Sequence, residues 1–362
     1  MNLTKGLQHG LFLIKYKLTH IKNTTFRVMS KYVVYDCDVG TDDAWGLLML
    51  TKAEEVYKKY KQTSPDAFKI LGVTCVHGNT DIHNATMNAL RVLDSVDRLD
   101  IPVYKGCATP MIPHIWKRER DFHGKDGFGD IQHECKIDVE LIQKQHAVNA
   151  MYQFACQYPK MVDYILVGPL TNFAMCINMY GDDFLDKVRN IYIMGGNVRG
   201  KGNATKSSEF NFMIDPEAAH IVLENVKKPL TILPWETCID GDLGITFAWR
   251  MEVLGKVPSK AIELLNRVED AIFTPKGFVN WIVCDAMLVA TYILPQHAIA
   301  KSRKYHATVE LTGSHTRGQM VLDHLREKED NATIITEVHK EHYKNIISWT
   351  AGVEGVSLDE QF

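Results

Sequence analysis

Four aspartates stand close together near the start of the chain, in the run Asp36-Cys37-Asp38-Val39-Gly40-Thr41-Asp42-Asp43. Carboxylates this close repel one another unless a cation or hydrogen bonds compensate. Ca²⁺ and Mg²⁺ take oxygen ligands, so the run is typical of a site for a hard cation. The simpler alternative is one N-capping aspartate with solvated neighbours, but a cap needs only one carboxylate. The spacing therefore favours a cation site at a tight turn.

The residues on either side place this run between a strand and a helix. Residues 32–35 are β-branched or aromatic and predict a buried strand, whereas the helix formers of 44–60 predict the helix that follows. Asp42 and Asp43 would fall in its first turn, where the helix dipole favours negative charge. Further strands are expected at 69–76, 102–104, 164–167, 191–194, 230–233 and 307–311, further helices at 84–96, 148–155, 170–177, 216–223 and 281–294, and a long loop at 108–135.

This alternation predicts an α/β fold with an open, mostly parallel central sheet and helices on both faces. Residues 31–362 show no repeat and no linker, so we expect them to form a single domain. In such sheets, ligands bind outside the carboxyl ends of the strands. Polar residues follow several expected strands at those ends, namely His77-Gly78-Asn79, residues 168–172, Gly195-Gly196-Asn197 and Trp235-Glu236. Together they predict one shared crevice.

Composition excludes several classes of protein. Lys and Arg number 41 against 44 Asp and Glu, a net charge of −3, so a nucleic-acid partner is not expected. The chain has no apolar stretch of the length that spans a bilayer, so a membrane is not expected either. The 8 cysteines form no C-x-x-C pair and are too sparse for a disulfide scaffold, which favours a reducing compartment.

Residues 1–30 differ from the rest because they carry Lys and Arg but no Asp or Glu. We expect them to form a basic, flexible N-terminal extension of a cytoplasmic protein. A mitochondrial targeting segment is the alternative, because such segments are basic and poor in acidic residues.

The aspartate run resembles the N-terminal metal motif D-x-D-x-G-x-D-D of the nucleoside hydrolase family, of the inosine-uridine-preferring type. Other segments match in the family's order, and the resemblance covers roughly residues 31–330. These segments are Gly78-Asn79, Gly168-Pro169-Leu170-Thr171-Asn172, Met194-Gly195-Gly196, Glu209-Phe210-Asn211-Phe212, Asp215-Pro216-Glu217-Ala218 and Asp285.

The resemblance implies a calcium-dependent enzyme of nucleoside catabolism that hydrolyses the N-glycosidic bond of ribonucleosides to ribose and free base. The implied calcium ligands are Asp38, Asp43, Asp285 and the backbone carbonyl of Val167, with Asp36 orienting the loop behind them. Asp38 would also be the general base that accepts a proton from a metal-activated water. The residues implied to hold ribose or the attacking water are Asp42, Asn79, Met194, Asn203, Glu209 and Asn211. A homodimer or homotetramer is expected by analogy with the family.

Three residues leave the choice of base open. Cys284 stands where many relatives have a His before the late metal-binding aspartate, as in a subgroup with Cys, and it either protonates the leaving base or only shapes the pocket. Trp281 either stacks on the base or belongs to the core. His123, in a loop that resembles the family's lid, either meets the base on closure or stays exposed.

Two other functions compete with this one. A haloacid-dehalogenase-like phosphatase also begins with a strand and D-x-D, but it requires Thr or Val where this chain has Gly40. A non-catalytic or weakly active nucleoside- or ribose-binding protein of the same fold is the alternative from a different class. The intact carboxylates argue against it, whereas the missing His argues for it.

Overall fold

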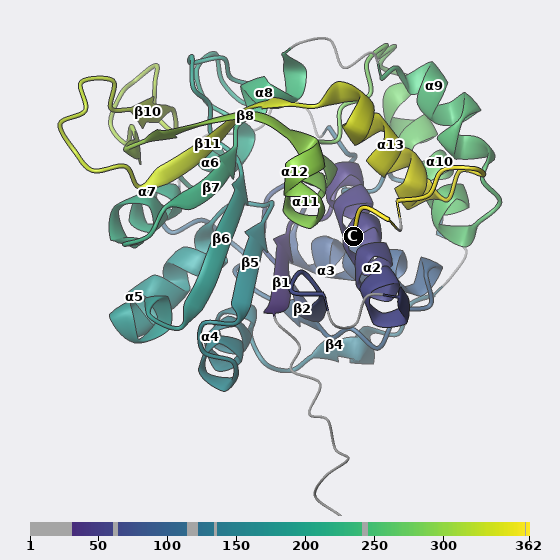
Figure 1. Ribbon diagram of the computed structural model, residues 1–362, viewed down its shortest axis with the longest axis horizontal. Helices are drawn as coiled ribbons and strands as arrows, with labels where there is room; N and C mark the ends of the chain where they lie inside the picture. The colour runs from purple at the N-terminus through teal and green to yellow at the C-terminus, as the bar shows by residue number, and fades with distance from the viewer. Residues whose placement is uncertain (1–30, 61–63, 114–121, 134–135, 241–244, 359) are drawn as a thin grey trace, which may run out of the picture.

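The computed structural model describes residues 31–60, 64–113, 122–133, 136–240, 245–358 and 360–362. The expected extension at residues 1–30 therefore lies outside the described residues. Nine strands form one central sheet in the order β4-β3-β2-β1-β5-β6-β7-β11-β8 (Figure 1). They are β1 (Lys31–Cys37), β2 (Phe68–Cys75), β3 (Val103–Lys105), β4 (Ile142–Gln143), β5 (Val162–Leu166), β6 (Val188–Met194), β7 (Leu230–Leu233), β8 (Ile299–Tyr305) and β11 (Ala332–Val338).

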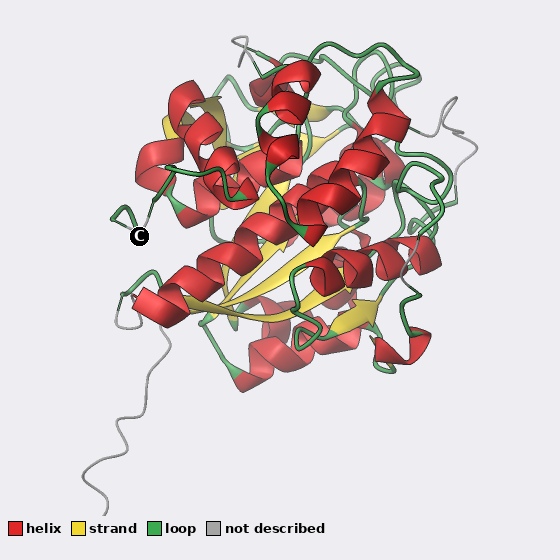
Figure 2. Ribbon diagram, turned by 90° about the vertical axis from the view of Figure 1, so that its right-hand side faces the viewer, coloured by secondary structure: helices red, strands yellow, loops and turns green. Residues whose placement is uncertain are grey.

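Every neighbouring pair in this sheet is parallel except the last, where β8 runs antiparallel to β11. Helices cover both faces (Figure 2). They are α2 (Thr41–Tyr60), α3 (Ile82–Ser95), α4 (Ala147–Gln157), α5 (Thr171–Leu185), α6 (Phe210–Ile214), α7 (Pro216–Asn225), α8 (Trp235–Ile239), α9 (Phe247–Glu252), α10 (Lys260–Phe273), α11 (Cys284–Ile293), α12 (Pro295–Ala298) and α13 (Lys340–Ala351), with 3₁₀ turns at Val139–Leu141 and Leu254–Lys256. The predicted open, mostly parallel α/β sheet is confirmed.

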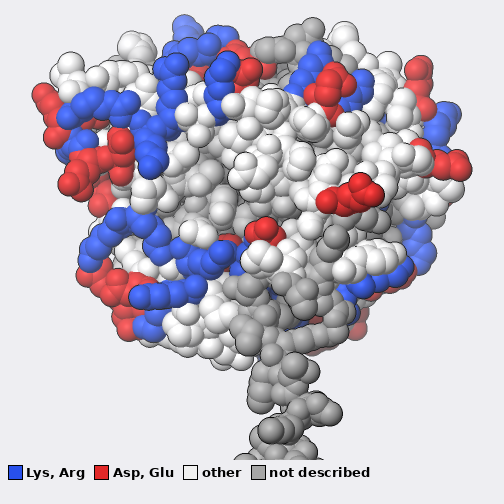
Figure 3. Space-filling model, in the orientation of Figure 1, with Lys and Arg blue, Asp and Glu red and all other residues white. Residues whose placement is uncertain are grey.

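Side-chain alternation along the strands builds two separate cores. On β1, Val33 and Tyr35 pack with α2, α3, α10, α11 and α13, whereas Val34 packs on the other face with α4, α5 and α7. The central strands are buried on both faces, as parallel sheets require. None of the helices in the described ranges is long and apolar enough to cross a membrane. Basic and acidic side chains are mixed over the face seen in Figure 3.

One expected strand is present but lies outside the central sheet, and one expected helix begins later than expected. The strand expected at 307–311 is β9 (Ala307–Val309), which pairs with β10 (Met320–Leu322) in a separate two-stranded sheet. The helix expected at 281–294 begins only at Cys284, because Trp281 is still extended and donates its backbone N–H to Ile245 O at 3.0 Å. Several elements were not anticipated, among them the edge strand β8 and the helices α10 and α13.

The order of the strands explains why the polar motifs meet. β2, β1, β5, β6 and β7 are consecutive neighbours in the sheet and run in the same direction. The turns that follow them begin near Asp38, His77, Val167, Gly195 and Pro234. Their carboxyl ends therefore open on one edge of the sheet, as the sequence predicted.

Candidate active site at the carboxyl ends of the strands

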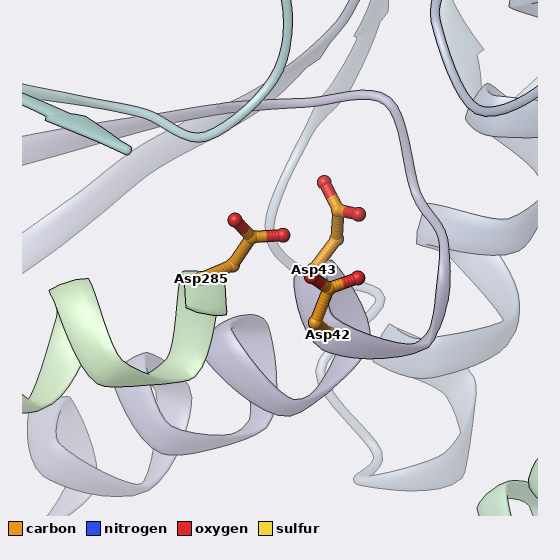
Figure 4. Close-up of side chains that lie close together, drawn as sticks. All are labelled: Asp42, Asp43 and Asp285. Carbon is orange, nitrogen blue, oxygen red and sulfur yellow. The ribbon is translucent and has the colours of Figure 1, made fainter. Parts of the chain in front are cut away.

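Three carboxylates converge at this edge. Oxygens of Asp42, Asp43 and Asp285 all lie within 4.8 Å of one another. Figure 4 shows Asp42 and Asp43 coming from the start of α2 and Asp285 from the start of α11, with their carboxylates around the same space. Asp43 is fixed from behind, since its carboxylate accepts the backbone N–H groups of Asp38 at 3.1 Å and Gly40 at 2.8 Å.

Asp38 lies directly behind this cluster and is fully enclosed. Its Oδ2 accepts the backbone N–H of Asn79 at 2.6 Å. A Cβ at Gly78 would lie 2.0 Å from Oδ2, and a Cβ at Gly168 would lie 3.1 Å from Oδ1, so both turns need glycine to pass this carboxylate. The tightest acidic group thus contains Asp42, whereas the sequence analysis assigned Asp38 to the metal and Asp42 to the ribose.

Burial raises the pKa of all four of these carboxylates, and repulsion by neighbouring aspartates raises it further for Asp42, Asp38 and Asp285. Burial, and then the charge of Asp43, raise the pKa of Asp42 to about 7. Burial raises the pKa of Asp43 to about 6, against the stabilising N–H donors of Gly40 and Asp38. The pKa values of Asp38 and Asp285 rise well above the usual range, from burial first and from neighbouring aspartates second. Such a cluster takes up protons near neutral pH unless a cation supplies positive charge.

A hard cation fits these residues. The donors of the cluster are all oxygens, as calcium and magnesium prefer, and Val167 lines the same cavity. Among the described residues, the buried Oδ1 of Asp42 has no hydrogen-bond partner. Its nearest positively chargeable neighbour is Nε2 of His123, 3.7 Å away. The cluster therefore offers ligand atoms that the protein itself leaves unsatisfied.

The carboxylates open into a cavity of about 390 Å³. The residues that the sequence analysis assigned to the sugar or the attacking water all line it, namely Asp42, Asn79, Met194, Asn203, Glu209 and Asn211. Asn211 is held by its amide, which donates to Val167 O at 2.7 Å and to Met194 O at 3.1 Å. The structure thus brings residues from the start of α2, the turn after β2 and the segment from the end of β6 to α6 to one cavity.

Glu209 combines a structural and a cavity-facing role. It caps α6 through the backbone N–H groups of Asn211 and Phe212, and it also accepts the N–H of Gly196. Burial raises the pKa of Glu209 to about 7, against these donors. Its carboxylate is therefore a fixed hydrogen-bonding group at the cavity wall.

Aromatic side chains also line the cavity, which the sequence analysis missed. Phe122, Phe273 and Phe278 contact one another there, with ring centroids 5.6–6.0 Å apart. The same cavity is also lined by Asn280, Ile282, Cys284 and Trp235. The three phenylalanines come from a loop, a helix end and a second loop, and their spacing in the sequence has no helical or strand period that would connect them.

Trp281 does not line this cavity and belongs to the core. It is 2% exposed and packs edge-on against Trp45, with ring centroids 5.3 Å apart. Its indole N–H donates to Glu269 Oε1 at 2.9 Å. Of the two alternatives for Trp281, the structure therefore supports the core position over base stacking, because its ring packs against Trp45 and does not line the cavity.

His123 lines the cavity and is 6% exposed, so it is not the exposed loop residue of the alternative reading. Its ring lies over Gly40, where a Cβ would come within 2.9 Å of ring carbons. Its Nδ1 accepts the backbone N–H of Thr41 at 3.3 Å. The ring thus closes over the turn that carries the aspartate run.

A buried carboxylate shapes the loop that carries Asn203. Glu236 is 1% exposed and accepts the backbone N–H groups of Val198, Arg199 and Lys201. Hydrogen bonds to a charged acceptor are stronger than neutral ones. The loop between β6 and α6 is therefore folded around one side chain.

Replacing Glu236 by Ala should destabilise the protein by about 2–4 kcal/mol, because three backbone donors would lose a charged acceptor inside the protein. Urea unfolding measures the loss. Glu236→Gln keeps one acceptor oxygen and should cost clearly less. Equal stability of the Ala variant and the wild type would show that the loop finds other acceptors.

Comparison with known proteins agrees with this geometry. Residues 33–345 match the model of a family described as inosine-uridine preferring nucleoside hydrolase. The inosine-uridine preferring nucleoside hydrolase of Crithidia fasciculata is 28% identical over 297 residues, which cover 82% of this chain and 88% of that protein. The pyrimidine-specific ribonucleoside hydrolase of Escherichia coli O81 (strain ED1a) is 27% identical over 325 residues, which cover 88% of this chain and 98% of that protein.

A solved structure agrees as well. An inosine-guanosine nucleoside hydrolase is similar with a TM-score of 0.77 and 25% identity, covering 90% of this chain and 99% of that one. The family match spans well over half of the chain and includes every residue of the acidic cluster. The chain therefore belongs to the inosine-uridine preferring nucleoside hydrolase family.

Proposed function

We propose that the protein hydrolyses the N-glycosidic bond of ribonucleosides to ribose and free base, with calcium as its cofactor and Asp38 as general base. One observation carries the proposal: a cluster of carboxylates faces a cavity that is also lined by amides, by the carboxylate of Glu209 and by aromatic rings. The polar groups suit a sugar with several hydroxyls, and the aromatic rings suit a flat nucleobase.

The residues proposed to hold the cation are Asp38, Asp43, Asp285 and the carbonyl of Val167, and Asp42 lies close enough to join them or to bind a ribose hydroxyl. Calcium, when bound, would neutralise these carboxylates, orient the ribose hydroxyls and acidify a water molecule. Asp38 would then accept the proton of that water. Its carboxylate is held in place by the N–H of Asn79, so it needs no reorganisation to act.

The same wall favours the charge that develops on the sugar. Breaking the bond leaves positive charge on C1′ and the ring oxygen, as in other glycosidic hydrolyses. Asp42, Glu209 and Asn211 would surround the ribose with oxygen atoms that stabilise it. Asn79 and Asn211 would hold hydroxyls or the attacking water, and Asn203 with Glu209 would reach the 5′-hydroxyl. Met194 would pack against the sugar.

Cys284 is proposed to shape the base end of the cavity rather than to protonate the base. A hydrogen bond with Cys238, and then burial, raise the pKa of its thiol well above the usual range, which makes it a weaker acid. His123 lines the same cavity. Contact between His123 and the base on closure stays a prediction. The homodimer or homotetramer, the cytoplasmic location and the flexible extension at residues 1–30 also stay predictions.

Replacing Cys284 by Ala should change purine nucleoside turnover by less than about tenfold, since a lost general acid costs roughly 10²- to 10⁴-fold. Steady-state kcat for inosine at pH 7 measures it. Cys238→Ala is the matched control, because it removes the thiol partner without touching the cavity. A loss of a hundredfold or more in Cys284→Ala alone would restore the proton-donor role.

Release of free ribose from a panel of purine and pyrimidine nucleosides tests the proposal against a non-catalytic binding protein. We expect ribose release from at least one nucleoside, loss of release on adding a calcium chelator, and recovery on adding calcium. Binding of nucleosides without any ribose release would establish the binding protein. Ribose release that is unchanged by the chelator would remove the cation from the mechanism.

A further inference from the structure

A buried carboxylate outside the cavity joins the two helices that carry the acidic cluster. Glu269 of α10 is fully buried, and its Oε1 accepts the indole N–H of Trp45 at 3.0 Å and that of Trp281 at 2.9 Å. Its Oε2 forms an ion pair with Nε of Arg250, which is also fully buried. One side chain thus holds two tryptophans and one arginine at the same point.

The two tryptophans are neighbours of the cluster in the sequence. Trp45 lies two residues after Asp43 on α2, and Trp281 lies four residues before Asp285, in the segment that enters α11. The rings contact each other at 81°, and the Arg250 guanidinium lies 5.4 Å from the centroid of the Trp45 ring. The starts of both helices are therefore tied to Glu269 through indole N–H groups.

The starts of α2 and α11 both need a contact that holds them in place. The carboxylates at the start of α2 and of α11 repel each other across the space that they share. No side chain caps the N-terminus of α11, where Val283 is the capping residue. The segment before it is held instead by the backbone bridge between Thr246 and Asn280 and by these indole contacts. A shared acceptor keeps the two helix starts at a fixed separation.

A buried ion pair is by itself a weak source of stability, because desolvation offsets the attraction between the charges. This network is fully buried, and two indole N–H groups share one oxygen of Glu269. We therefore look for a role of Glu269 other than stabilisation of the fold. We infer that Glu269 is a positioning residue that holds Asp42 and Asp43 against Asp285 at the separation a cation requires. The inference rests on the proposed function, in that it takes this cluster to be a cation site.

Calcium binding to the chelator-stripped, full-length protein tests the inference without any turnover. Isothermal titration calorimetry should give a calcium affinity about 10- to 100-fold weaker for Glu269→Gln than for the wild type, the range found when partners behind metal ligands are lost. The glutamine keeps the packing volume, but its neutral oxygen accepts the two indole N–H groups more weakly than a carboxylate does, and its amide N–H group faces the Arg250 guanidinium.

Asp163→Asn is the matched control. Asp163 is also fully buried, pairs with Arg189 at 2.6 Å and binds the hydroxyl of Tyr292 at 3.1 Å, near the far end of the same helix α11. It should lose stability in thermal unfolding but keep the wild-type calcium affinity. An equal loss of affinity in both variants would overturn the inference, because general loosening would then explain it.

Trp281→Phe provides a second variant if Glu269→Gln does not fold, since it removes one indole donor and leaves the ion pair with Arg250 intact. Its calcium affinity should also fall. Wild-type affinity in a folded Glu269→Gln or Trp281→Phe protein would overturn the inference alone, while calcium-dependent ribose release would still support the proposed function. Absence of calcium binding to the wild type would overturn the inference together with the proposed cofactor.

Discussion

Asp38→Asn should lower kcat for ribose release by about 10²- to 10⁴-fold, the range for a lost general base, while nucleoside binding survives. Asparagine keeps an oxygen that can accept the N–H of Asn79, so the turn after β2 stays in place. What it loses is the ability to take a proton and one negative charge beside the proposed cation, so Asp38→Asn and its control Asp36→Asn are both compared with the wild type at saturating calcium. Release of ribose in a single turnover, together with nucleoside binding by calorimetry, separates the chemical step from binding.

Asp36→Asn is the matched control for this prediction. Asp36 is two residues away and equally buried, and burial raises its pKa to about 7. Its Oδ1 accepts hydrogen bonds from Thr74 at 2.6 Å and Asn172 at 2.8 Å, and an asparagine oxygen can accept both. We expect a far smaller fall in kcat than for Asp38→Asn. Equal ribose release by wild type and Asp38→Asn, or equal loss in both variants, would contradict a specific role of Asp38 as base.

The aspartate run could be predicted because its information is local. The strand β1, the turn at Gly40 and the start of α2 are encoded within about a dozen residues, and their polar ends meet other strand ends by the geometry of any parallel sheet. The sequence analysis assigned Asp38 rather than Asp42 to the metal, whereas the tightest cluster contains Asp42. This difference depends on the direction of the side chains, and the Asp38 carboxylate lies against Gly78 and Gly168 from two other loops.

Trp281 shows where sequence periodicity fails. It stands three residues before Cys284 in an apolar run, and this spacing suggests one continuous helix. The helix begins later, at a Val283 cap without any side-chain hydrogen bond, so the sequence contains no capping residue that marks the start. Its partner Glu269 lies on a helix that the sequence analysis did not anticipate, so the buried network could not be inferred.

The sequence analysis also missed the edge strand of the sheet and the aromatic residues of the cavity, because both depend on contacts between distant segments. Strand β8 has an exposed, charged stretch, which a single sequence does not distinguish from a loop, and it becomes a strand by pairing with β11. Phe122, Phe273 and Phe278 meet only because long-range packing brings their segments together. Single phenylalanines in a sequence are usually core residues, so no signal identified them as a cavity wall.

Calcium should stabilise the protein, and more strongly as the pH rises. In the calcium-free protein the folded-state pKa of Asp42 is about 7 and that of Asp43 about 6, against 3.8 as the ordinary value. A carboxyl whose pKa is raised on folding contributes stability that is complete below about pH 4 and is lost as the pH rises through 6 to 7. Calcium binds the ionised carboxylates, so its binding strengthens over the same interval in which this contribution is lost.

The difference in Tm with and without saturating calcium should therefore grow between pH 5 and pH 8 and reach about 5 °C, the shift expected for ligand at a few hundred times its Kd in a protein of this size. Differential scanning calorimetry on chelator-stripped protein measures it, and taking the difference cancels groups that titrate far from the cluster. Asp285→Asn removes one charge from the cluster and leaves an oxygen in its place, so it should abolish most of the calcium effect and flatten its pH dependence. A Tm gain that is equal at pH 5 and pH 8, or that persists in Asp285→Asn, would mean that calcium stabilises the protein from another site.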